Sequence, residues 1–260
     1  MTSSRIIDYV KISRFTFGAL VTHALSTERE EILGMLIGKI TSDKGTVGAV
    51  VQHIKILERA DKRKDRVEAT PIQLDSARQL AEQLDARVIG WYHSHPHITI
   101  QPSPVDLRNQ WTNQQMGDFF GIIVSVFDHD NDNKGTIRLK AFQTIERSEE
   151  KTIEIQIVPD NQVLFSAHPS NFPNQLVELA KILFKEETKY FQAAMARIEA
   201  SGASQLEVIR AQSVHQTAVT ALLQYYCKPL IAALQSTLNV QERLQVEMKK
   251  EISLARAGGE

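Results

Sequence analysis

The chain has 260 residues, of which 42% are hydrophobic, and its formal net charge is −1. This length can hold one large domain or one domain with an appendage, and the near-neutral charge gives no reason to expect nucleic acid or an anionic membrane as a direct partner. Cys227 is the single cysteine, and no apolar run suits a signal peptide or a membrane span, so we expect an intracellular, soluble protein.

The first quarter of the chain predicts strands and one helix. Residues 6–12 alternate loosely and predict an edge strand, and residues 15–26 have apolar side chains at helical spacing. Residues 31–40 and 46–57 are rich in aliphatic and β-branched side chains. The turn-forming residues 42–45 lie between them, so the two runs predict an antiparallel hairpin.

Four residues in this region need an interpretation. Gly34 and Gly38 weaken a strand by themselves, so we expect another backbone or a substrate to approach closely there. His23 lies in the predicted helix and His53 in the second predicted strand. We interpret both as structural histidines rather than functional ones.

The middle of the chain predicts a helix and further strands. Residues 59–68 form a highly charged loop, for which composition alone favours a solvated connection. Residues 71–84 carry apolar side chains three and four positions apart, which is typical of an amphipathic helix. Residues 119–127, 136–145 and 152–159 predict three more strands.

The last third predicts helices. A stretch with two prolines separates a first domain, residues 1–165, from a helical region, residues 174–260. Helices are predicted at residues 176–198 and 206–226, and Pro229 marks a helix start or a kink.

The apolar residues of the last helix follow an imperfect heptad: Leu230, Leu234, Leu238, Leu244, Met248 and Ile252. One interpretation is an amphipathic helix packed on its own domain. A domain of about 160 residues offers little surface to cover so long a tail, so we favour a helical bundle or coiled coil with another chain.

The most informative stretch is VIGWYHSHPHITIQPSPVDLRNQWTNQQM. The apolar residues 88–92 predict a buried strand that ends in His93 and His95, whose side chains point the same way because they are two positions apart. Ser103 suits a helix N-cap, and Asp106 would then lie in the first helical turn. The pattern predicts a strand–loop–helix unit with its polar side chains at the rim of a sheet.

Two imidazoles and one carboxylate are ligands that suit zinc, and three protein ligands leave one position open, as in catalytic zinc sites. We therefore expect one Zn²⁺ per chain, held by His93, His95 and Asp106. The alternative is a set of solvated polar residues on a loop. His97 is a further imidazole, but Asp106 already completes the set, so we assign His97 to the loop or to the substrate side.

This stretch resembles the JAMM motif of the MPN-plus metalloproteases, which remove ubiquitin or ubiquitin-like proteins. That family also has a glutamate directly before an apolar, glycine-containing strand, as in Glu31-Ile32-Leu33-Gly34. From the residues alone, Glu30 and Glu31 are equivalent surface acids. The resemblance selects Glu31 as general base, assigns zinc to the two histidines and Asp106, and assigns oxyanion stabilisation to Ser103.

The resemblance is strongest to the BRCC thirty-six type of JAMM deubiquitinase, through residues 23–40, 60–68 and 90–108. It implies an α+β fold: an MPN domain whose central, mostly antiparallel sheet is flanked by helices, followed by a helical bundle or coiled coil. It also implies cleavage of lysine-63-linked polyubiquitin, with loop 59–68 helping to hold ubiquitin. The implied location is cytoplasmic and nuclear.

The partners implied by this resemblance are an MPN-minus scaffold of the Abraxas type, in a heterodimer that pairs again, and further BRISC/ARISC-like subunits. Two alternatives stay open: a JAMM isopeptidase for another linkage or ubiquitin-like protein, and a non-catalytic MPN scaffold. A zinc deaminase is disfavoured because the chain lacks the Pro-Cys-x-x-Cys pattern of such enzymes.

Overall fold

The computed structural model describes residues 4–59, 69–129, 135–146, 149–163, 172–202 and 204–257. The chain divides into two compact units, Met1–Leu179 and Ala180–Glu260. In the described part of the chain, no helix combines the length and the apolar character that crossing a membrane requires.

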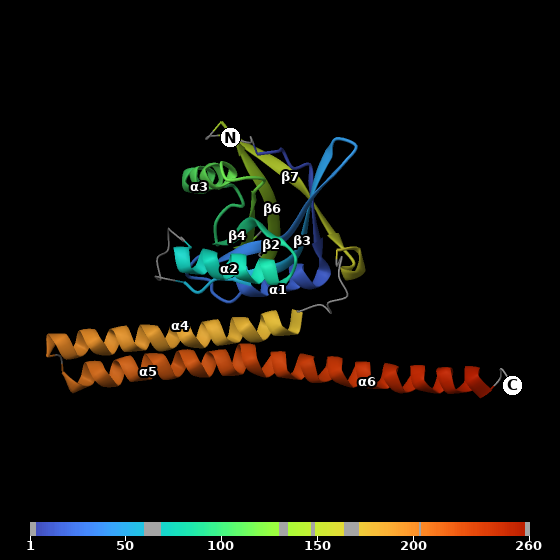
Figure 1. Cartoon of the computed structure of the whole chain (residues 1–260). Coiled ribbons are helices and arrows are strands. Elements are labelled where there is room, and N and C mark those ends of the chain that lie inside the picture. Colours follow the sequence, from blue (N-terminus) through green and yellow to red (C-terminus); the bar gives the residue numbers. More distant parts are fainter. Residues whose placement is uncertain are drawn as a thin grey trace. The chain divides into compact units, whose positions relative to one another are not determined.

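The first unit is built on a closed β-barrel (Figure 1). Its strands are β1 (Tyr9–Ser13), β2 (Leu33–Asp43), β3 (Thr46–Ile56), β4 (Arg87–Pro96), β5 (Phe120–His129), β6 (Gly135–Ile145) and β7 (Glu149–Val158). Around the barrel they follow the order β1-β3-β2-β4-β5-β6-β7. Neighbours pair antiparallel in the hairpins β2–β3, β5–β6 and β6–β7 and between β2 and β4. The predicted α+β class with flanking helices is confirmed. The sheet, which was predicted to be mostly antiparallel, is mixed, because β1–β3, β1–β7 and β4–β5 pair in parallel.

The prediction of an edge strand near the N-terminus is wrong. Strand β1 pairs in parallel with β3 on one side and with β7 on the other. Val10 and Ile12 are fully buried. The loose alternation of this segment did not reveal that its backbone closes the barrel, because both pairing partners lie far away in sequence.

The hairpin β2–β3 forms as predicted. Both glycines of β2 meet a close neighbour. At Gly38 this neighbour is another backbone, as expected, whereas at Gly34 it is a side chain. A Cβ at Gly34 would lie 2.3 Å from the ring of Tyr92 on β4, and one at Gly38 would lie 1.9 Å from the carbonyl oxygen of Val50 on β3. Only glycine lets β2 approach both neighbouring strands this closely.

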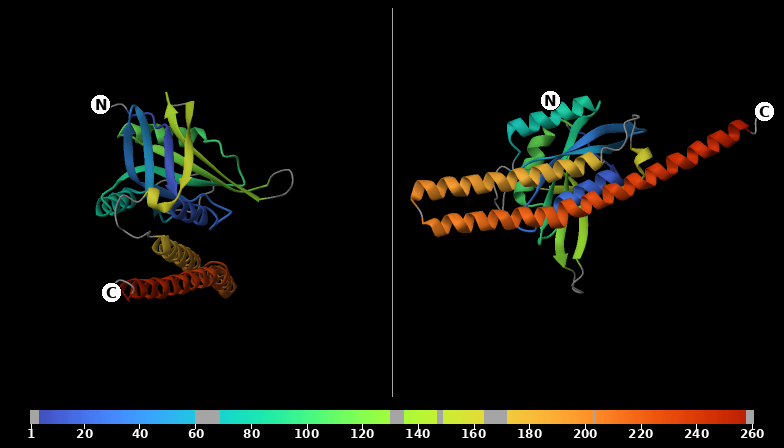
Figure 2. Two further views of the ribbon diagram at one scale, coloured as in Figure 1. Left: turned by 90° about the vertical axis from the view of Figure 1, so that its right-hand side faces the viewer. Right: turned by 90° about the horizontal axis from the view of Figure 1, so that it is seen from below.

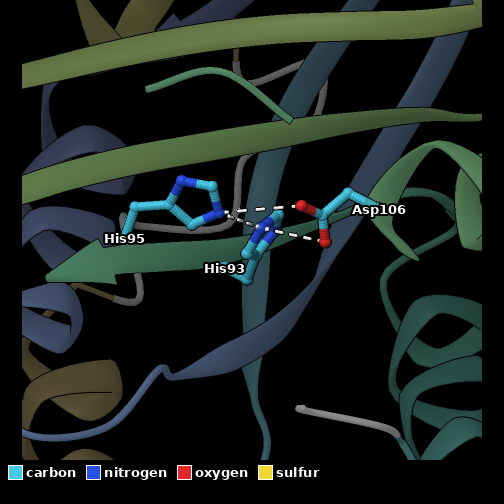
Figure 3. Close-up of side chains that lie close together, drawn as sticks. All are labelled: His93, His95 and Asp106. Carbon is cyan, nitrogen blue, oxygen red and sulfur yellow. Dashed lines mark hydrogen bonds and ion pairs between the residues drawn. The ribbon is translucent and has the colours of Figure 1, made fainter. Parts of the chain in front are cut away.

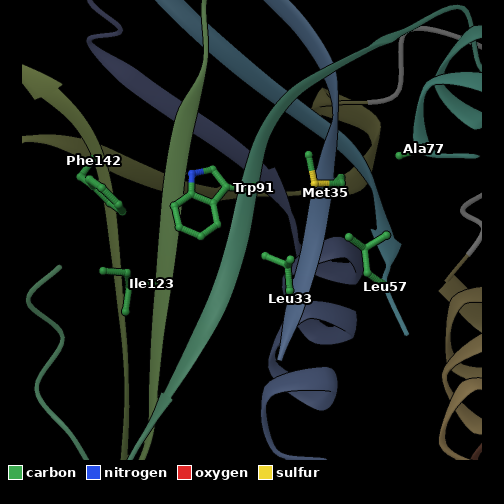
Figure 4. Close-up of a cluster of buried hydrophobic side chains, with 7 residues drawn as sticks. All are labelled: Leu33, Met35, Leu57, Ala77, Trp91, Ile123 and Phe142. Atoms are coloured by element: carbon green, nitrogen blue, oxygen red, sulfur yellow. The ribbon is translucent and has the colours of Figure 1, made fainter. Parts of the chain in front are cut away.

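Among the described residues, the helices that lie wholly within the first unit are α1 (Arg14–Ala24), α2 (Pro71–Gln83) and α3 (Pro104–Gln114), and a short 3₁₀ turn covers Asp160–Gln162. Helix α3 connects the parallel strands β4 and β5. Figure 4 shows one hydrophobic cluster of this unit, formed by Leu33, Met35, Leu57, Ala77, Trp91, Ile123 and Phe142. This core spans β2, β4, β5 and β6, and therefore supports the strand that carries the histidines.

The C-terminal region is helical, as predicted. It contains α4 (Phe172–Ser201), α5 (Gln205–Ala221), a π-helical turn (Leu222–Cys227) and α6 (Lys228–Ala257). The last three form one continuous rod (Figure 2). The π turn ends at Cys227, two positions before Pro229, whose missing N–H and bulky ring disturb the regular α-helical hydrogen bonds of the preceding turn. Phe191 stacks on His215 with ring centroids 4.5 Å apart, which ties α4 to α5.

Candidate metal centre

Strand β4 presents both histidines to one point. It lies between β2 and β5, so its backbone is hydrogen-bonded on both sides. Trp91, His93 and His95 follow one another two positions apart and share one face of the strand. All three side chains are buried. The strand predicted from the apolar run is thus a central, rigid support.

The first turn of α3 brings in the carboxylate. Ser103 is the N-cap, as predicted, and its Oγ accepts the Asp106 N–H at 3.2 Å. In return, Asp106 Oδ2 accepts the Ser103 N–H at 2.7 Å and the Ser103 O–H at 2.6 Å. This reciprocal capping box holds the Asp106 side chain in a single orientation at the helix start.

The three donor groups meet as Figure 3 shows. His93 Nε2 and His95 Nε2 lie 3.0 Å apart, and Asp106 Oδ1 and Oδ2 lie 3.4 Å and 3.7 Å from them respectively. Ligands of a tetrahedral zinc at 2.0–2.1 Å lie about 3.3 Å from one another. The residues present therefore fit a metal ion between them.

The charge of this cluster shifts two pKa values. Burial alone would raise the pKa of Asp106, but hydrogen bonds from His93, His95 and Ser103 outweigh burial and hold it well below its usual range. Burial would likewise lower the pKa of His95, but its bonds to Asp106 and to the Thr99 carbonyl outweigh burial and raise it. A pocket that favours positive charge beside a buried carboxylate suits a cation.

The orientation of each histidine has a visible cause. His95 Nδ1 donates to the Thr99 carbonyl oxygen at 2.6 Å, which leaves the Nε2 lone pair facing His93 and Asp106. His93 is held differently: its ring stacks on Trp91, with centroids 4.7 Å apart and planes at 9°. Both histidines therefore turn Nε2 to the same point.

The candidate base, Glu31, lies just before β2. Its charge contributes to the raised pKa of His95, so it acts electrostatically on the cluster. The adjacent Glu30 pairs instead with Arg59. The following residue, Ile32, is bonded through its backbone to Ser94, which lies between the two histidines.

His97 lies apart from the cluster. It has a positive φ of 59°, its side chain is 50% exposed, and its ring stacks on Phe127. Its Nε2 is 3.9 Å from the Glu28 carboxylate. This position agrees with a loop role rather than a ligand role. Of the charged loop predicted at 59–68, only Arg59 falls within the described residues.

Three residues around the cluster were not singled out from the sequence: Trp91, Ser94 and Gln110. Trp91 precedes His93 by two positions, and Gln110 follows Asp106 by four, so strand and helix periodicity would have placed each beside a ligand. Ser94 points to the opposite face from the histidines. Its partner, Ile32, is 62 positions away in sequence, which no local pattern indicates.

Comparison with known proteins agrees with this fold. Residues 7–118 match the family described as JAB1/Mov34/MPN/PAD-1 ubiquitin protease, and residues 174–253 match the BRCC36 C-terminal helical domain. The chain is 37% identical to a Xenopus tropicalis protein named "Lys-63-specific deubiquitinase BRCC36", with 94% of this chain and 95% of the relative covered. A Camponotus floridanus protein of the same name is 32% identical, with 94% and 93% covered.

The barrel and its buried His-His-Asp group thus define a protein of the JAB/MPN class of ubiquitin proteases. The helical-domain match and the identity over nearly the whole chain narrow the assignment. The chain belongs to the BRCC36 family.

Proposed function

We propose that this chain is a zinc-dependent deubiquitinase that hydrolyses isopeptide bonds in lysine-63-linked polyubiquitin. The observation that carries the proposal is the buried cluster of His93, His95 and Asp106 in a member of the BRCC36 family. The preference for lysine-63 linkages comes from the names of the relatives. Linkage choice depends on how two ubiquitins dock, which these three residues do not determine.

Zinc is the metal that the donor set favours. Two imidazoles and one carboxylate are borderline ligands, and they leave one of four positions open. When bound, zinc would supply a Lewis acid that makes water acidic near neutral pH and polarises the isopeptide carbonyl. We propose one Zn²⁺ per chain, held by His93, His95 and Asp106.

The protein residues would manage the proton and the developing negative charge. Glu31 takes a proton from the attacking water and later delivers it to the departing lysine amine. Ser103 stabilises the oxyanion by donating a hydrogen bond. In the structure the Ser103 hydroxyl donates to Asp106 Oδ2 at 2.6 Å, so this role requires the hydroxyl to turn from Asp106 to the substrate.

The test is cleavage of a panel of diubiquitin linkages by the full chain, co-expressed with its scaffold partner, with and without a zinc chelator. Chelator-sensitive cleavage of the lysine-63 linkage alone is the expected result. Cleavage of several linkages would retain the isopeptidase but remove the linkage assignment. A zinc-loaded complex that cleaves nothing would indicate the non-catalytic scaffold instead.

The exposed apolar face of α6 supports a helical partner. Leu238, Leu244, Met248 and Ile252 are each at least 50% exposed, which is costly for a helix that stays alone in water. We propose that another helical chain covers this face, namely an MPN-minus scaffold of the Abraxas type within a BRISC/ARISC-like assembly. Both partner names come from the family resemblance.

A matched pair of variants tests the partner surface. Leu238→Glu places a charge within the apolar face and should abolish co-purification of the co-expressed scaffold. Ser236→Glu adds the same charge about 200° away around the helix, on the opposite side, and should leave the complex intact. The proposed interface would be contradicted if both variants lose the co-purified scaffold equally, or if both retain it.

A further inference from the structure

The candidate ligands come from two separate secondary-structure elements. A hydrogen bond between two side chains joins these elements beside the site. His93 lies on β4, and Asp106 lies on α3. Trp91 is two positions before His93 on the same strand face, and Gln110 is one helical turn after Asp106. The indole Nε1–H of Trp91 donates to Gln110 Oε1 at 2.7 Å.

The indole also contacts a ligand directly. Its ring lies almost parallel to the His93 imidazole, at 9° and with centroids 4.7 Å apart. His93 Nδ1 is buried and has no hydrogen-bond partner in the described part of the chain. Apart from its contacts with the other two candidate ligands, the His93 ring is oriented by this stacking on Trp91. His95 is oriented instead by its hydrogen bond to the Thr99 carbonyl.

Gln110 is itself held firmly. Its side chain is 0% exposed, and its amide nitrogen donates to Gln114 Oε1 at 2.8 Å and to the Phe119 carbonyl oxygen at 2.9 Å. The indole can only donate, so Oε1 must face Trp91 and the amide orientation is determined. Phe119 directly precedes β5, the strand that pairs with β4. Gln110 thus ties α3 to the sheet at a defined distance.

We propose that Trp91 and Gln110 form a clamp that sets the spacing between His93 and Asp106, and that both are positioning residues for the metal. This inference rests on the proposed zinc site. Two ligands on separate elements bind tightly only if their separation is set in advance, and outer groups of this kind commonly change metal affinity by about 10- to 100-fold. The simpler alternative is that both side chains only fill the core.

Two substitutions separate positioning from packing. Trp91→Phe keeps an aromatic ring against His93 but removes the N–H. Gln110→Met keeps the shape of the side chain but removes the amide. Each should weaken zinc binding about 10- to 100-fold. The double variant should be little worse than either single variant, because both remove the same bond.

Gln143→Met is the matched control. Gln143 is also a buried glutamine. Its Oε1 accepts a hydrogen bond from the Ile7 N–H, and its amide nitrogen donates to the carbonyl oxygens of Arg5 and Phe119. It lies on β6 and contributes no bond between β4 and α3. We expect this variant to unfold at a lower temperature than the wild type and to bind zinc as tightly.

The experiment titrates zinc into the metal-free full-length chain against a chromophoric chelator, with the melting temperature of each metal-free variant recorded in parallel. Normal zinc affinity in both Trp91→Phe and Gln110→Met overturns the clamp, as does an equal loss in Gln143→Met. If one clamp variant does not fold, the other carries the test. If the wild-type chain binds no zinc, both the clamp and the proposed function are overturned. If the wild type binds zinc and the clamp variants bind it as tightly, only the clamp is overturned.

Discussion

Ser94 and Ile32 exchange two hydrogen bonds. Ser94 Oγ accepts the Ile32 N–H at 3.0 Å, and the Ser94 N–H donates to the Ile32 carbonyl oxygen at 3.2 Å. Ser94 lies between His93 and His95 but points to the other face of β4, and Ile32 directly follows Glu31. One buried serine therefore links the segment of the candidate base to the strand of the candidate ligands.

Ser94→Ala should slow turnover without loss of metal. The buried Ile32 N–H loses its acceptor, which costs about 1–3 kcal/mol of stability, and the shift of Glu31 should lower kcat about 10- to 100-fold. KM and zinc content should change little. Ser94→Thr keeps the hydroxyl and should recover most of kcat. Zinc loss in Ser94→Ala would contradict this account, because it would mean that Ser94 supports the ligands instead.

Glu31→Gln should retain zinc and lose cleavage. The amide cannot accept the proton of the attacking water, and general base catalysis contributes about 10²- to 10⁴-fold in rate. The measurement is kcat of the zinc-loaded complex together with its zinc stoichiometry. Glu28→Gln, at an exposed carboxylate, is the control and should stay near wild type. If Glu31→Gln loses zinc, Glu31 is a ligand and the assignment as base is wrong.

His23 should make the first unit sensitive to acid. Burial, with a smaller effect of the Arg59 charge, lowers its pKa to about 3, and its Nδ1 bonds the Tyr92 hydroxyl at 2.9 Å. The unfolded chain binds this proton near pH 6.5, whereas the folded chain does not. The stabilising contribution is therefore complete above about pH 6.5 and is lost as the pH falls towards about 3.

Urea unfolding of the metal-free chain at pH 7.5 and pH 4.5 measures this effect. His23→Gln removes the titrating group, so the difference in unfolding free energy between the two pH values should be smaller than in the wild type. The carboxylates contribute equally to both proteins and cancel in the comparison. An identical difference in both proteins would show that His23 is protonated in the fold or is exposed.

Local patterns in the sequence were sufficient for the ligand-bearing segment. The two-residue period of a strand places His93 and His95 on one side, and the Ser103 and Asp106 spacing is that of a capping box. Each of these relationships lies within one turn or one strand. Local propensity and side-chain alternation therefore determine them without help from the rest of the chain.

Only the tertiary structure decided the relationships between distant segments. The closure of the barrel through β1, the Ser94–Ile32 bonds and the Trp91–Gln110 bond join residues that local periodicity does not relate. The two adjacent glutamates are a further example. Glu30 forms an ion pair with Arg59, and the charge of Glu31 contributes to the raised pKa of His95. Such contacts depend on strand register and on helix packing, which are set only when the whole core assembles. In the unfolded chain these residues are far apart, so no local preference can bring them together.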